Sequence, residues 1–160
     1  MQALINAVNR SLAGLVILLS CALVACVVWQ VLSRYLLGDP STITDELARY
    51  LFMWTGLIGA AYTSGQKKHL AIDLLTMNLT GTRKRISQLF IEATTILFAS
   101  IVMIYGGGKL FLKILAMGQV SPALGMPMGL IYLALPVSGA LILFYSLLSI
   151  IDLLRGTADA

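Results

Sequence analysis

Residues 12–37 have the sequence LAGLVILLSCALVACVVWQVLSRYLL, which decides the fold class of the chain. Apart from Arg34 the stretch carries no charge. A helix of roughly 20 apolar residues crosses the ~30 Å hydrocarbon core of a bilayer. The stretch is longer than the apolar core of a typical signal peptide, so we interpret it as a retained membrane-spanning helix.

Three further apolar stretches predict spanning helices at about 46–65, 86–105 and 129–154. Hydrophobic residues make up 59% of the 160-residue chain and charged residues 11%, against about 25% in a typical soluble domain. The sequence therefore predicts an all-α integral membrane protein with four transmembrane helices, which forms a single membrane domain over residues 1–160.

Local signals set the expected helix ends. Asn9 or Ser11 can cap the first helix, and Gly38-Asp39-Pro40 should end it. Pro136 removes a backbone donor from the fourth helix and should bend it.

Two segments are too polar to span and too apolar to be free loops. Residues 66–82 combine leucines with lysines, so we expect an amphipathic segment along the membrane interface, or a short re-entrant turn. Residues 107–117 carry Lys109 and Lys113 one helical turn apart and resemble an amphipathic extension after three glycines.

The net charge of +4 follows the expected topology and does not indicate a nucleic-acid partner. Most basic residues fall on one side of a four-span arrangement: Arg10, Lys67, Lys68, Arg83, Lys84, Arg85 and Arg155. The positive-inside rule then places both termini and the middle loop in the cytoplasm, and the loops near 39–46 and 117–128 outside.

Ionisable residues in the spans could carry transport chemistry, because burying them is otherwise unfavourable. Arg34, Asp45, Glu46 and Arg49 fall at the external ends of the first two helices, where local ion pairs are expected. Glu92 lies about two turns inside the third helix. It could carry protons, or it could pair with a basic loop residue or a partner subunit.

The chain offers little for catalysis. Cys21 and Cys26 are five residues apart on one helix and cannot form a disulfide with each other, which disfavours a membrane thiol oxidoreductase. His69 has no second metal ligand at a useful spacing, and there is no phosphate-binding glycine loop. We predict that the chain is not an enzyme and holds no metal or cofactor of its own.

Small and aromatic residues predict close helix packing or a subunit interface, because small side chains let helices approach closely in lipid. These are Trp29, Trp54, Gly56, Gly59, Ala60, Pro136 and Gly139.

Several short motifs occur in order along the chain: WQVLSRY at 29–35, TDELARYLFMW at 44–54, GAA at 59–61, HLAID at 69–73 and SPALGMP at 121–127. With Tyr132, Pro136 and Gly139 in the last helix, they resemble the small, Q-type membrane subunit of tripartite ATP-independent periplasmic (TRAP) transporters. The resemblance covers nearly the whole chain.

This resemblance implies a non-catalytic subunit of a sodium-coupled organic-acid importer of the bacterial inner membrane, for a dicarboxylate or sialic acid. A large multispanning subunit would bind sodium and substrate, and a periplasmic binding protein would deliver the substrate. The small subunit would enlarge the static scaffold. Arg34, Asp45, Glu46 and Arg49 would help to dock the binding protein, and Lys67, Lys68 and His69 would anchor the cytoplasmic interface. The alternative hypothesis is a small proton-coupled exporter that acts as a homodimer through Glu92.

Overall fold

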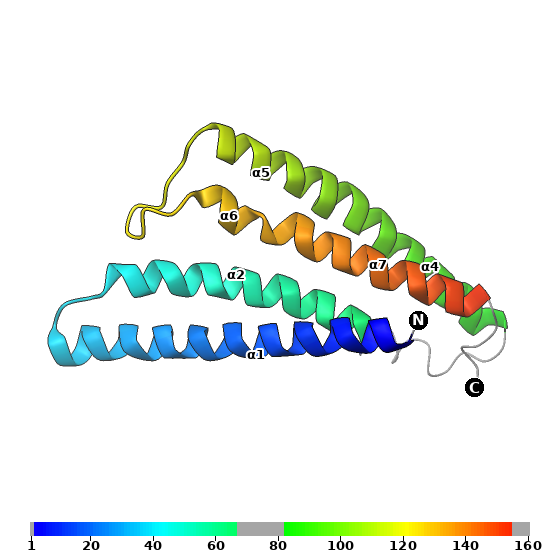
Figure 1. Cartoon of the computed structure of the whole chain (residues 1–160), viewed down its shortest axis with the longest axis horizontal. Helices are drawn as coiled ribbons and strands as arrows, with labels where there is room; N and C mark the ends of the chain where they lie inside the picture. Colours follow the sequence, from blue (N-terminus) through cyan, green and yellow to red (C-terminus); the bar gives the residue numbers. More distant parts are fainter. Residues whose placement is uncertain (1, 67–81, 155–160) are drawn as a thin grey trace.

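Two antiparallel helical hairpins make up the computed structural model, which describes residues 2–66 and 82–154 (Figure 1). The first hairpin consists of α1 (Gln2–Leu32), its π-helical end η1 (Ser33–Leu37) and α2 (Thr42–Gly65). The second consists of α4 (Thr82–Phe98), η2 (Ala99–Gly106), α5 (Gly107–Ala116), α6 (Met128–Tyr132) and α7 (Ala134–Leu154). We call the end with the turns 38–41 and 117–127 the loop end, and the opposite end the terminal end.

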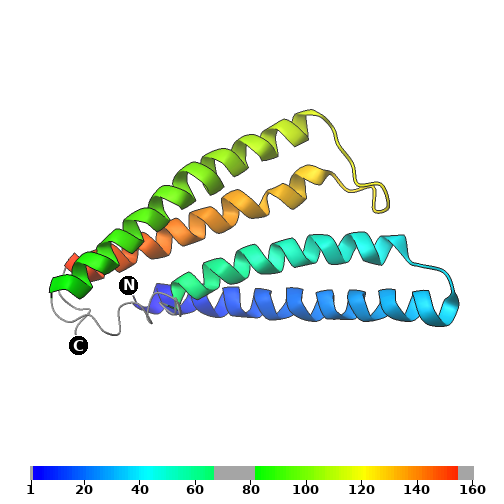
Figure 2. The same ribbon diagram turned by 180° about the vertical axis from the view of Figure 1, so that it is seen from behind.

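The helices lie in a row. From one edge to the other the order is α1, α2, α7 and α4, and each helix contacts its neighbours in that order (Figures 1 and 2). Such a row leaves large apolar side chains exposed, for example Ile17 at 63%, Leu18 at 66% and Phe90 at 73%. Exposed apolar surface of this extent must be covered by lipid or by another protein.

The predicted helical fold class is confirmed, but the predicted number of spans is confirmed only in part. The described residues form helices and contain no strand, only an isolated bridge between Val120 and Pro127. Among the described residues, three helical segments are long and apolar enough to span a membrane: Ile5–Leu37, Arg83–Ala116 and Met128–Ile151. The exception is α2, which begins with charged residues and is rich in threonine, tyrosine and glycine. Its crossing stays a prediction.

The first helix begins ten residues earlier than the predicted start at residue 12. It extends to Gln2 because Ile5, Val8 and Leu12 share a face that packs in a cluster with Ile58 of α2 and Tyr145 of α7. Asn9 lies inside α1 and does not cap it. Its side-chain oxygen accepts a hydrogen bond of 2.6 Å from the Tyr145 hydroxyl.

The amphipathic extension expected at 107–117 continues the third helix as α5, up to Ala116. Helical structure runs without interruption from Thr82 to Ala116, so the helix passes through the three glycines instead of ending near residue 105. Packing explains the continuity: Gly107 is buried, and a Cβ there would lie 2.8 Å from Cβ of Leu135 and 3.3 Å from Cδ of Pro136. The glycine lets the helix approach α7 closely.

The last helix is interrupted near Pro136, where a bend was predicted. A short helix, α6, ends at Tyr132, and α7 begins at Ala134. Because proline has no N–H, it cannot donate to the carbonyl of Tyr132, four residues before it. The predicted interfacial segment, with Lys67, Lys68 and His69, lies outside the described residues.

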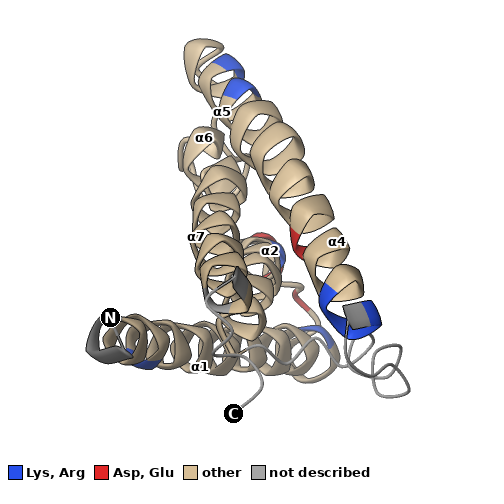
Figure 3. Cartoon of the chain, turned by 90° about the vertical axis from the view of Figure 1, so that its right-hand side faces the viewer, with Lys and Arg blue, Asp and Glu red and all other residues tan. Residues whose placement is uncertain are grey.

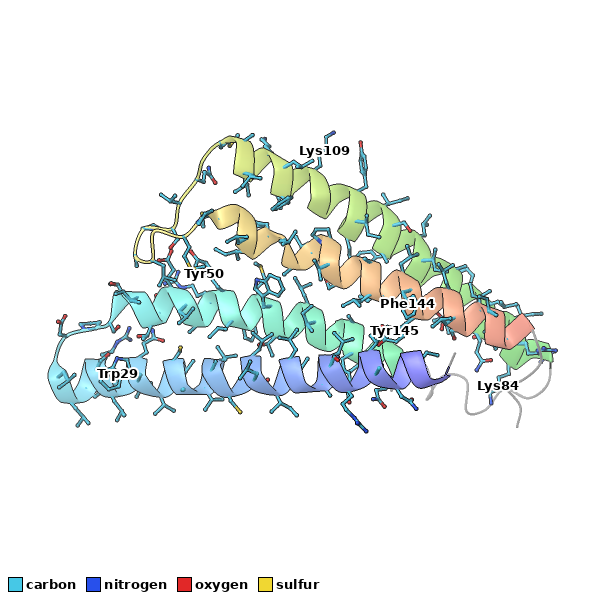
Figure 4. All side chains as sticks on the ribbon, in the orientation of Figure 1. Trp29, Tyr50, Lys84, Lys109, Phe144 and Tyr145 are labelled. Atoms are coloured by element: carbon cyan, nitrogen blue, oxygen red, sulfur yellow. The ribbon has the colours of Figure 1, made fainter. Side chains whose placement is uncertain are left out.

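The two hairpins are joined by two apolar clusters. One contains Ala61 of α2, Ala99 and Met103 of η2, and Ile142 of α7. The other contains Leu12, Ile58 and Tyr145, with the Phe144 ring packed edge-on against Tyr145, near the terminal end (Figure 4). Burial in these clusters fixes α7 against α2.

We expect Tyr145→Phe to destabilise this junction by about 1 kcal/mol, because it removes the hydroxyl that reaches Asn9 across the hairpins. Thermal unfolding of the purified chain in a mild detergent measures the change. Tyr105→Phe is the control, since Tyr105 is 66% exposed and its hydroxyl makes no hydrogen bond within the described chain. Equal unfolding temperatures for the two variants would contradict the role of the hydroxyl.

Candidate functional site at the loop end

Polar side chains join α1 to α2 at the loop end. Gln30 Nε2 donates a hydrogen bond of 2.6 Å to Asp45 Oδ1. Ser33, which is 2% exposed, donates to the carbonyl of Gln30 at 3.1 Å and accepts from the backbone N–H of Ser41 at 3.4 Å. Gly38 then ends the helix in the left-handed region, at φ 67°. These contacts close the turn 38–41 tightly.

The predicted charge cluster separates into three parts. Asp45 forms an ion pair with Arg49 one turn along α2, and the hydrogen bond from Arg49 is the main cause that lowers the pKa of Asp45. The pair stabilises the helix little, because the Arg49 side chain is 73% exposed. Arg34 forms no hydrogen bond or ion pair within residues 2–66 and 82–154. The Glu46 carboxylate forms hydrogen bonds with the second hairpin instead.

Glu46 holds the loop 117–127 against the start of α2. Its carboxylate accepts hydrogen bonds from the backbone N–H groups of Ala123 at 2.8 Å and Leu124 at 3.1 Å, and from the Tyr50 hydroxyl at 2.5 Å. The Tyr50 hydroxyl is the main cause that lowers the pKa of Glu46, with further contributions from Ser121 and the two N–H groups. We call these contacts the Glu46 latch.

The loop that the latch holds, residues 117–127, has a defined shape of its own. Ser121 N–H donates to the Met126 carbonyl at 2.8 Å, and Gly125 N–H donates to the Ser121 carbonyl at 2.9 Å. Gly125 has φ 64°, a conformation that favours glycine. Met117 and Val120 are 57% and 59% exposed. The loop therefore presents apolar side chains from an ordered backbone.

An apolar cavity of about 290 Å³ separates the hairpins beneath this loop. Its lining residues carry no charge: Leu19, Leu47, Tyr50, Leu51, Trp54, Met126, Leu130 and Ile131. The cavity shows that direct helix packing is incomplete at the loop end. The latch bridges the hairpins where packing between them is poorest.

The predicted packing residues divide between intrachain contacts and the outer surface. Trp54 packs in the cluster with Leu12, and a Cβ on Gly139 would lie 2.6 Å from Cβ of Met103. In contrast, no atom lies within 4 Å of a Cβ placed on Gly56 or Gly59.

The remaining three residues divide in the same way, since Pro136 lies beside Gly107 inside the chain. Ala60 is exposed, and Trp29 is 51% exposed at the loop half of α1. Gly56 and Ala60 of α2 therefore lie on the outer surface, whereas Ala61 of α2 and Gly139 of α7 pack within the chain.

The sequence interpretation missed Gln30, Tyr50 and the backbone donors of Ala123 and Leu124. Gln30 could have been found, because an amide inside an apolar stretch requires a hydrogen-bonding partner. Tyr50 lies one helical turn from Glu46, which also suggests a contact. Backbone donors in a distant loop leave no signal in the sequence.

The described residues contain no group of three His, Cys, Asp or Glu side chains that could hold a metal ion. Cys21 and Cys26 are both free thiols.

Comparison with known proteins gives a family match and several relatives. Residues 23–156 match the family described as "Tripartite ATP-independent periplasmic transporters, DctQ component". The chain is 28% identical over 141 residues to the sialic acid TRAP transporter small permease protein SiaQ of Vibrio cholerae, covering 86% of this chain and 78% of that protein. It is 33% identical over 100 residues to the C4-dicarboxylate TRAP transporter small permease protein DctQ of Rhodobacter capsulatus, covering 62% and 44%.

A longer relative is the sialic acid TRAP transporter permease protein SiaT of Haemophilus influenzae. The chain is 27% identical to it over 145 residues, which cover 88% of this chain and 22% of that protein. A sequence like this chain therefore forms about a fifth of a larger permease polypeptide in that relative.

Proposed function

Because the chain belongs to the DctQ component family of the tripartite ATP-independent periplasmic transporters, we propose that it is a static scaffold in a sodium-coupled importer of organic acids. The row of helices is the observation that carries this proposal. A single layer has two open faces, so it is suited to brace a neighbouring protein and poorly suited to enclose a pathway. The family membership also favours this role over an exporter that works through Glu92.

Small subunits of TRAP transporters partner with large permease components, and the longer relative with a matching segment supports such a partner here. Substrate and sodium would bind in that large subunit. The relatives are named for sialic acid and for C4-dicarboxylates, so the class that we propose is a small organic acid. The bacterial inner membrane, with both termini in the cytoplasm, is the location that this role requires.

The outward face of α2 is the surface that we propose for the large subunit. Phe52, Gly56, Ala60 and Thr63 are all exposed and lie on one stripe of the helix. Small residues at this spacing let a second helix approach closely. The open space around Gly56 means that no helix among residues 2–66 and 82–154 packs on this face.

Gly56→Leu should reduce recovery of the large subunit about tenfold or more, because a leucine there would hold the two helices apart. The measurement is purification of the tagged chain from its native host in mild detergent, with the large TRAP permease component quantified by mass spectrometry. Gly14→Leu is the control, since Gly14 on α1 has equally open surroundings. Absence of any large permease component with the unchanged chain would refute the scaffold role itself.

The loop end is the surface that we propose for the periplasmic binding protein. It combines the exposed Arg34 and Arg49 with the latched loop 117–127. An ordered loop binds a partner at lower entropic cost than a flexible loop does. Glu46 then acts through the loop that it positions, and the charged side chains provide the rim of the contact.

A further inference from the structure

Glu92 is an ionisable group that the proposed scaffold role does not explain. It is the acidic residue of α4 and lies ten residues after Thr82, about 15 Å along the helix. Other charged positions of the second hairpin lie nearer the helix ends, as the coloured ribbon shows (Figure 3). Glu92 falls within the segment Arg83–Ala116, which is apolar enough to span a membrane.

The position of Glu92 on α4 points toward α7. Ala99 and Met103 follow it at seven and eleven residues, so the three share one stripe of the helix, and both of the later residues are buried in a core cluster. Arg85 Nη2 contacts the carbonyl of Leu153 at 2.7 Å, and Ala99 lies beside Gly139. Glu92 lies midway between Arg85 and Ala99 along α4 and η2, and Ser146 lies midway between Gly139 and Leu153 along α7. The two residues are therefore at the same level. The Glu92 side chain is half-buried there.

The described part of the chain supplies no partner for this carboxylate. Within residues 2–66 and 82–154, Glu92 forms no hydrogen bond and no ion pair. The ion pair found in these residues joins Asp45 and Arg49. Arg85 is two turns away and already donates to the carbonyl of Leu153. Acyl chains cannot solvate a carboxylate, so a charged Glu92 needs a cation or hydrogen-bond donor from outside the described residues.

We propose that Glu92 is an intersubunit anchor whose carboxylate binds a lysine or arginine side chain from a spanning helix of the large membrane subunit. This inference rests on the proposed function, because it requires that subunit. Charge complementarity selects the partner: an unpaired carboxylate in an apolar span is best matched by one buried cation. The helix row has α4 at one edge, beside α7, so a helix of another subunit can approach α4 from outside the row.

The anchor makes two opposite predictions for Glu92→Leu. Recovery of the large subunit with the tagged chain should fall at least about tenfold. Removal of the carboxylate would leave the lysine or arginine of the large subunit buried without a counter-charge. The isolated chain should unfold at the same temperature as the unchanged chain or at a higher one, because it loses an unpaired carboxylate. Glu92→Gln, which keeps hydrogen bonding without charge, should give an intermediate recovery.

Thr94→Leu is the matched control. Thr94 is exposed on the other side of α4 and its hydroxyl donates to the carbonyl of Phe90 at 2.8 Å, so its replacement should leave recovery unchanged. Unchanged recovery with Glu92→Leu would overturn the anchor while leaving the scaffold role in place. A lower unfolding temperature of the isolated Glu92→Leu chain would also overturn it, because the partner would then belong to this chain. If the unchanged chain recovers no large subunit, the proposed function fails first.

Discussion

A Gly139→Val chain should lose most of the packing between α7 and η2. The new Cβ would lie 2.6 Å from Cβ of Met103, 3.2 Å from Cγ1 of Ile104 and 3.4 Å from the carbonyl oxygen of Ala99. A Cβ cannot move by a change of rotamer, so the two helices would have to separate. Overpacking of this kind costs about 1–3 kcal/mol, and a β-branched side chain at a helix crossing should reach the upper end.

Thermal unfolding of the purified chain in detergent tests this expectation. Gly14→Val is the matched control, because it places the same side chain in the middle of a helix where no atom lies within 4 Å. We expect a large drop in the unfolding temperature for Gly139→Val and a small one for Gly14→Val. Similar values for the two variants would show that the α7–η2 contact contributes little to stability.

The helices could be predicted from the sequence because long apolar runs and strong breakers are local features. The stretch 12–37 and the breaker Gly38-Asp39-Pro40 predicted where the first helix ends, and Gly38 does adopt the left-handed conformation there. The start of α1 could not be found in this way. It depends on Tyr145 and Ile58, which are distant in sequence and support Ile5 and Val8.

The third helix shows how tertiary contacts override local propensity. Three successive glycines at 106–108 are unfavourable in a helix, by about 1 kcal/mol each relative to alanine, so an interruption was a reasonable expectation. The structure keeps the helix because Gly107 fits against Leu135 and Pro136 on α7. A glycine run inside an apolar helix therefore has two meanings, a break or a close crossing, and only the neighbouring helix distinguishes them.

The candidate site was predictable only where its contacts are local. Asp45 and Arg49 lie one turn apart on α2, and the structure pairs them as the spacing suggests. Glu46 has the same kind of spacing to Arg49 but bonds instead to a loop 77 residues away. The preference is understandable, since one carboxylate there satisfies two backbone donors and a hydroxyl, whereas Arg49 is largely in solvent.

The Glu46 latch also carries a pH dependence whose sign follows from its lowered pKa. A carboxyl whose pKa is lower in the folded chain stabilises the fold above its ordinary value of 4.5, and the contribution is lost as the pH falls through the lowered value. Order in the loop 117–127 should therefore be constant at neutral pH and should decline in acid below pH 4.5. In the Glu46→Gln variant, the order of the loop should not decrease in acid.

Glu46→Ala should release the loop at neutral pH and, if the proposed docking holds, weaken capture of a periplasmic binding protein. Leu124 N–H keeps a second acceptor, Oγ of Ser121 at 3.2 Å, but Ala123 N–H loses its acceptor. Amide hydrogen exchange across 121–126 should therefore accelerate, by about tenfold or more at Ala123 and less at Leu124. Asp45→Asn is the control, because it breaks the ion pair with Arg49 on the same turn and leaves the latch intact. Equal exchange in the two variants would mean that the loop holds its shape without Glu46. Faster exchange with undiminished capture would mean that the binding protein does not need an ordered loop.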